Sequence, residues 1–213
     1  MHKTFAAQIS LAVARTRTAI QLGSVLLLGM LTGCAPQSGP AQFFRLQPSA
    51  LQPTQFEPTD ASSRVIGLGP VKIPGYLDRP QIVTGGPGDQ LLLDEYMRWA
   101  EPLRDNITQV LSENLSTQLR QDHILPFPWN RALNPAYQVD IDIARFHVNE
   151  ARDCELWANW SIIHRGKAVA LRKSRIVLPA AGDGYPSMVA TQNQALAEFS
   201  GEIARALNDL PKE

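Results

Sequence analysis

The feature that most constrains the fold is a set of three β segments in the C-terminal half of the chain. The first, Tyr137–Val148, alternates apolar with polar residues, which predicts a strand with one buried face. Its phase slips before Phe146, which predicts a bulge. Two further β segments, Leu156–His164 and Ala168–Leu178, are separated by the turn Arg165–Lys167. The sequence therefore predicts an antiparallel meander.

Two other segments have helical period. Apolar residues recur at three- and four-residue steps over Pro102–Leu119 and again from about Pro186 to Leu210, which predicts two amphipathic helices. Shorter β segments are expected at Phe43–Leu46, Arg64–Pro74, Gln81–Thr84, Leu91–Trp99 and Ile124–Phe127. We predict an α/β fold: a single domain in which two main amphipathic helices pack a mixed β-sheet that contains the meander.

The N-terminal segment is typical of a secretory signal. Residues 1–33 contain basic side chains at Lys3, Arg15 and Arg17 and no acidic one, followed by an apolar run at Ala19–Leu31. That run is shorter than the about 20 residues that a membrane-spanning helix needs. Because it is the only long apolar run, a polytopic membrane protein is excluded.

The end of this segment, Leu31-Thr32-Gly33-Cys34, resembles the lipobox of bacterial lipoproteins. The resemblance implies cleavage between Gly33 and Cys34, a diacylglyceryl group on the Cys34 sulfur and acylation of the new amine. More than one acyl chain makes membrane attachment durable. Ala35 after the cysteine resembles an outer-membrane sorting signal.

The predicted organisation has three parts. Residues 1–33 are the signal peptide, residues 34–63 are the lipid anchor and a proline-rich tether with a short first strand, and residues 64–213 are the globular domain. The whole chain has 20 basic and 20 acidic residues, and loss of the signal peptide leaves a small negative charge. This balance argues against nucleic-acid binding.

Motifs for catalysis are missing from the sequence. It contains neither a G-x-S-x-G nucleophile elbow nor a P-loop, and the stretch from Gly85 to Gly88 is expected to be a turn. Asp140 and Asp142 alternate on one strand, where a solvated face is favoured over an acid–base pair. We predict no catalytic residue, no metal and no cofactor.

Four residues at a predicted turn are of the types that bind metal ions. His147, Glu150, Asp153 and Cys154 are close in sequence, but polar residues are expected at such a turn. Cys154 is the only cysteine after Cys34 and is expected to be buried as a small apolar group.

Aromatic and turn residues are the candidates for binding. Trp157 and Trp160 have opposite parity, so we expect them on opposite faces of the sheet, one of them beneath a helix. Tyr76 and Leu77 follow a Pro-Gly turn, and with Arg79 they are the predicted partner-binding residues.

Several fragments in a fixed order resemble the PqiC/YmbA family of ABC-type transport auxiliary lipoproteins. They cover nearly all of the chain after the signal peptide: Cys34, Phe43–Leu46, Val71–Leu77, Trp99–Leu103, Asn114–Leu119, Asp142–Phe146, Trp160–Gly166 and Tyr185–Met188. The stretch Pro126–Trp129 and Cys154 depart from the pattern.

This resemblance implies a non-enzymatic accessory lipoprotein of an MCE/ABC-type intermembrane lipid transport system. It would be anchored through Cys34 to outer-membrane lipid and face the periplasm. It would dock to an MCE-domain protein (PqiB-like) with its inner-membrane complex, and self-assembly into a homo-oligomeric ring is also implied. Two alternatives stay open: a carrier lipoprotein that binds a lipid or small molecule on its own, and a periplasmic hydrolase with an unfamiliar motif.

Overall fold

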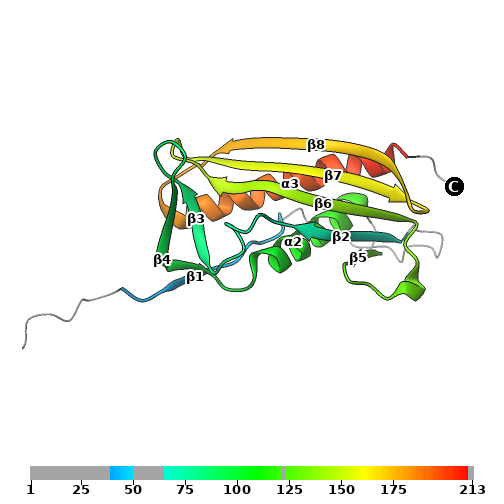
Figure 1. The fold of residues 1–213 in the computed structure, drawn as a ribbon, viewed down its shortest axis with the longest axis horizontal. Helices are drawn as coiled ribbons and strands as arrows, with labels where there is room; N and C mark the ends of the chain where they lie inside the picture. Colours follow the sequence, from blue (N-terminus) through cyan, green and yellow to red (C-terminus); the bar gives the residue numbers. More distant parts are fainter. Residues whose placement is uncertain (1–38, 50–64, 121–122, 211–213) are drawn as a thin grey trace, which may run out of the picture. The chain divides into compact units, whose positions relative to one another are not determined.

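The meander lies in an eight-stranded sheet in the computed structural model, which describes residues 39–49, 65–120 and 123–210. Strands β6 (Tyr137–Val148), β7 (Asp153–His164) and β8 (Lys167–Pro179) pair antiparallel in sequence order (Figure 1). The register of β6 against β7 shifts between Ile143 and Arg145. Both the predicted meander and the predicted bulge are confirmed.

The other strands make the sheet mixed, because β6 pairs along its second edge with two of them. Parallel to β6 lie β2 (Ile66–Lys72), along its first half, and β3 (Gln81–Gly85), at its last residue. On β2 lies the short parallel strand β5 (Ile124–Pro126). On β3 lies β4 (Leu91–Trp99), antiparallel, followed by β1 (Gln42–Phe44), parallel to β4. The mixed sheet of the predicted α/β fold is thereby confirmed.

Two long helices cover one face of this sheet (Figure 1). These are α2 (Leu103–Leu119) and α3 (Gly184–Asn208), while the one-turn 3₁₀ helix η1 (Arg131–Leu133) connects β5 to β6. Pro102 is the N-cap of α2, a position where its missing N–H costs no hydrogen bond. Apolar stripes of both helices and the inward residues of the sheet form one core, which includes Leu68, Ile107, Leu115, Ile141, Phe146, Leu156 and Phe199.

The segment after β1 belongs to this domain. The compact unit begins at Ala41, and Leu46 is buried in the core. Asn106 of α2 bonds both backbone groups of Leu46: its Oδ1 accepts from the N–H at 2.7 Å and its Nδ2 donates to the carbonyl at 3.3 Å. The Asn106 side chain therefore satisfies the two backbone groups that a neighbouring strand would otherwise pair with.

Cys34 and the predicted signal peptide lie outside the described residues, as does most of the predicted tether. Within the part of the chain that is described, neither helix combines the length and the apolar character needed to cross a bilayer.

Candidate functional site

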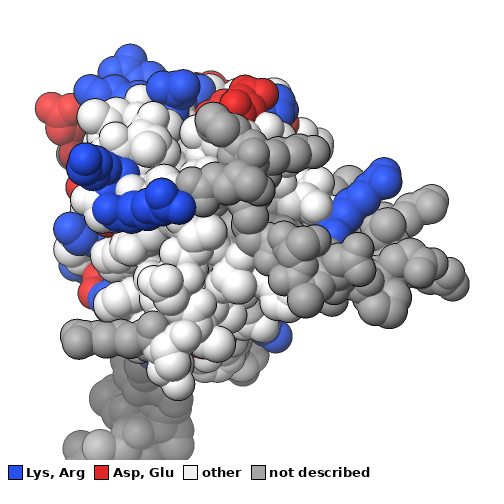
Figure 2. Space-filling model, turned by 90° about the vertical axis from the view of Figure 1, so that its right-hand side faces the viewer, with Lys and Arg blue, Asp and Glu red and all other residues white. Residues whose placement is uncertain are grey.

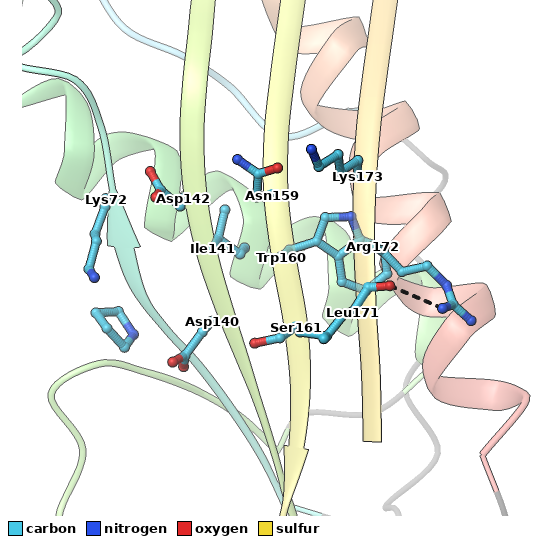
Figure 3. Close-up of a pocket in the computed structure, with 11 residues that line it drawn as sticks. Lys72, Asp140, Ile141, Asp142, Asn159, Trp160, Ser161, Leu171, Arg172 and Lys173 are labelled. Carbon is cyan, nitrogen blue, oxygen red and sulfur yellow. Dashed lines mark hydrogen bonds between the residues drawn. The ribbon is translucent and has the colours of Figure 1, made fainter. Parts of the chain in front are cut away.

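The face of the meander opposite the helices carries an open groove of about 440 Å³ (Figure 3). Strand alternation places Asp140, Asp142, Asn159, Ser161 and Lys173 on this outer face, and Lys72 of β2 borders it. Residues at the alternate positions of these strands point toward the helices. Trp160 points toward α3, where its ring centre lies 6.3 Å from that of Phe199. This confirms that one tryptophan of the pair lies beneath a helix.

Charges of both signs line this outer-face groove without pairing. Among the described residues, no ion pair joins Lys72 or Lys173 to Asp140 or Asp142. Asp140 instead accepts a hydrogen bond from Gln138 of the same strand. The groove also holds Leu171, which is 73% exposed. Unpaired charges beside an exposed apolar side chain fit a partner surface better than a buried small ligand.

Tyr76 lies at the other end of the same sheet face, in contact with β6. Its hydroxyl is 3.2 Å from Nδ1 of His147, and the two rings meet edge to face. Leu77 does not share this exposure: it is only 2% exposed and packs in the core. The expectation that Leu77 contacts a partner is therefore wrong, because the turn directs its side chain inward. Arg79 is exposed.

A layered cluster of charged and aromatic side chains extends from this tyrosine across the strands. Arg145 forms an ion pair with Glu155 at 2.6 Å, and its guanidinium lies 4.2 Å from the ring centre of Trp157. Arg175 of β8 lies 5.0 Å from the same ring. These cation–π contacts hold Trp157 on the outer face, as its parity predicts.

Burial and charge shift the ionisation of this cluster. Burial is the main cause that lowers the pKa of His147 below 6.5, and the nearby Arg145 lowers it further. Burial alone would raise the pKa of Glu155, but hydrogen bonds from Arg145 and Asn149 outweigh it and lower that pKa. The cluster therefore pairs a neutral imidazole with an ionised carboxylate near neutral pH.

The residues considered for metal binding do not converge. Within the described residues, no group of three or more His, Cys, Asp or Glu side chains is placed to hold a metal ion. Cys154 is fully buried, as expected, and burial raises the pKa of its thiol to about 12. It acts as an apolar core residue.

The contact between Tyr76 and His147 could not be found in the sequence. The two residues lie far apart in the chain, and only the parallel insertion of β3 against the end of β6 brings the preceding turn to this strand. One part of the cluster could be predicted from the sequence. The phase slip at the bulge places Arg145 and His147 together on the outer face.

The outer edge of the sheet at β8 is basic. Lys167, Arg172, Lys173 and Arg175 are all exposed on this strand, which contains no acidic residue. Figure 2 shows Lys and Arg side chains gathered along the upper part of the end that carries the β7–β8 turn, with a broad uncharged area below. Basic edges of this kind discourage uncontrolled strand pairing.

A mixed sheet with helices on one face and a charged groove on the other defines this chain as an α/β domain. The sequence matches the family model of the ABC-type transport auxiliary lipoprotein component over residues 44–204. The chain belongs to this family, which confirms the resemblance seen in the sequence.

Solved structures support the fold. The crystal structure of an uncharacterized protein superposes with a TM-score of 0.67 at 22% identity, covering 79% of this chain and 99% of that one. A DUF330-family protein from Xanthomonas campestris gives 0.60 at 17% identity, covering 77% and 93%. The PelC dodecamer from Paraburkholderia phytofirmans gives 0.42 at 8% identity, covering 65% and 85%, which is too distant to inform assembly. No curated protein matches the chain.

Proposed function

We propose that this protein is a lipid-anchored, non-enzymatic accessory subunit of an MCE/ABC-type intermembrane lipid transport system. Membership of the transport auxiliary lipoprotein family over residues 44–204 is the observation that carries this proposal. The protein is held at the outer membrane by acylated Cys34, faces the periplasm and docks to an MCE-domain partner.

The anchor keeps the domain close to its membrane. Strand β1 begins at Gln42, soon after Cys34. At no more than about 3.5 Å per residue, the intervening chain reaches roughly 30 Å when fully extended. A domain on so short a tether can join its own membrane to a partner that arrives from across the periplasm.

Two surfaces are suited to docking. The outer-face groove offers unpaired charges of both signs and the exposed Leu171. The turn that carries Tyr76 and Arg79 borders the same sheet face farther along. A polar rim around exposed apolar side chains is the usual composition of a reversible protein interface.

Substitution of the lipidated residue tests the anchor and the docking together. Cys34→Ala should move the protein out of the outer-membrane fraction, whereas pull-down of the MCE-domain partner from detergent extracts should persist. A Cys34→Ala protein that remains with the outer membrane would refute acyl anchoring. A wild-type protein that recovers no MCE-domain partner would refute the docking.

Charge reversal in the groove tests the docking surface. Lys72→Glu combined with Lys173→Glu should reduce partner recovery at least tenfold, because both substitutions reverse unpaired charges at a proposed interface. Lys167→Glu, on the same strand but outside the groove, is the matched control. Equal recovery with both variants would remove the groove from the interface.

A carrier function is the second candidate, favoured by the groove volume of about 440 Å³, which lies within the usual range for ligand sites. Mass spectrometry of the natively extracted protein distinguishes the two. A stoichiometric lipid retained by the protein in the absence of its partner would support the carrier.

A further inference from the structure

Strand β4 exposes a run of apolar residues that the core does not use. Leu91, Leu92 and Leu93 are 43%, 49% and 46% exposed, and Tyr96 is 43% exposed. We name these four residues the β4 edge patch. Successive residues of a strand point to opposite faces, so three consecutive leucines make both faces of β4 apolar.

The edge of β4 is also open beside this patch. Strand β1 pairs with β4 only at Met97, Arg98 and Trp99. Over the described residues, the segment from Leu91 to Tyr96 therefore has β3 on one side and no strand on the other. Exposed apolar residues along an open strand edge mark an interaction surface.

The patch lies at the end of the domain from which the chain leads to its anchor. Strand β1 is at the same end as β3 and β4, opposite the C-terminal end of α3 (Figure 1). Phe43 of β1, paired with Arg98 of β4, is 65% exposed. On the proposed function, Cys34 holds this end within roughly 30 Å of the lipid leaflet.

We propose that the β4 edge patch, together with Phe43, contacts the lipid surface beside the acyl anchor. The ligand is the boundary between headgroups and acyl chains of a zwitterionic phospholipid leaflet. A protein partner laid on one face of β4 would leave the leucines of the other face in water, whereas a lipid boundary surrounds both. Tyr96 has the amphipathic ring that favours this depth, and Phe43 adds an apolar ring of the kind that interfacial segments bury.

Charge and backbone chemistry define how the patch meets the lipid. Acidic side chains lie before it at Asp89 and within its span at Asp94 and Glu95, and only Arg98 of β4 is basic. The Asp94 carboxylate accepts from the Tyr96 N–H and that of Glu95 from the Gln81 amide, so both positions stay polar. An acidic rim is repelled by anionic lipid. The unpaired backbone groups of the open edge need water, so contact is limited to interfacial depth.

Site-directed labelling of the lipidated protein tests this contact. Leu92→Cys, labelled with an environment-sensitive fluorophore, is reconstituted into phosphatidylcholine–phosphatidylethanolamine vesicles with and without brominated lipid. Cys154 does not compete for the label, because it is buried and the pKa of its thiol is about 12. Leu171→Cys on β8 is the matched control, since Leu171 is also an exposed leucine of an edge strand but lies away from the anchor.

We expect brominated lipid to quench the label at position 92 at least threefold more than the label at position 171. Adding anionic lipid should not increase this quenching. Vesicle flotation distinguishes a failure of the acyl anchor from a failure of the lipid contact at the β4 edge patch. A protein that fails to float refutes the anchor on which the contact rests. A protein that floats with a water-accessible label at position 92, or with a label shielded from both water and lipid by a second protein, refutes the lipid contact alone.

Discussion

At the scale of single residues, burial changes the chemistry of Cys154. Its thiol lies in the core between β6 and β8, and burial raises its pKa from 9.0 to about 12. At pH 8 the thiolate, which is the reactive form, is therefore scarce as well as inaccessible. We expect no reaction with a thiol reagent in the folded protein and full reaction in guanidinium, monitored by mass spectrometry. Rapid labelling of the native protein would contradict this burial.

We expect His147 to make the stability of the protein depend on pH. Because its pKa is lowered in the folded state, the unfolded chain takes up a proton first as the pH falls below 6.5. The free energy of unfolding should therefore decrease between pH 6.5 and 5. His147→Gln should flatten this decrease in urea titrations. Equal pH slopes in wild type and His147→Gln would contradict the prediction.

Ser174 joins the sheet to a helix through a single hydroxyl. It accepts a hydrogen bond from the Trp160 indole N–H at 2.9 Å and donates one to Glu202 of α3. Ser174→Ala leaves the buried indole N–H without this acceptor, so we expect a loss of about 1–3 kcal/mol in the free energy of unfolding. Ser161→Ala, on the outer face, should cost less than about 0.5 kcal/mol. Urea denaturation of both variants provides the comparison.

At the scale of elements, side chains of α2 form hydrogen bonds with the backbone of the chain after β1. Asn106 bonds both backbone groups of Leu46, and the Asn114 side chain accepts from the Ser49 N–H at 3.0 Å. Asn106→Ala should lower the free energy of unfolding by about 2–3 kcal/mol, because two buried backbone groups lose their partner. Gln109→Ala, on the exposed side of α2, should cost about 0.5 kcal/mol or less. Similar losses in both would exclude a special role for Asn106.

Local periodicity predicted the elements well and their arrangement less well. The limits of β4 were predicted to the residue. Glycines and a proline precede the strand and Pro102 follows it, and these residues mark its two ends. The parallel pairing of β2 with β6 and of β1 with β4 joins segments remote in sequence, and no local pattern encodes it. Leu77 was misassigned for a related reason: a turn residue faces solvent unless distant elements close over it, as they do here.

At the scale of the whole molecule, β6 is the structural centre. It pairs with β7 along its full length and with both β2 and β3 on its other edge. We expect the amides of β6 and β7 to exchange most slowly in hydrogen–deuterium exchange, since their opening requires global unfolding. Those of β1 and β5, three-residue strands at the margins, should exchange fastest among the strands. Early exchange along β6 would contradict this hierarchy.

The place where the chain enters the domain has a mechanical consequence under the proposed anchoring. Force on a lipid anchor would reach the domain at the start of β1, whose three residues pair with β4. Two residues after β1, the Asn106 side chain bonds both backbone groups of Leu46, so force between two membranes meets a second set of hydrogen bonds where the chain enters the domain.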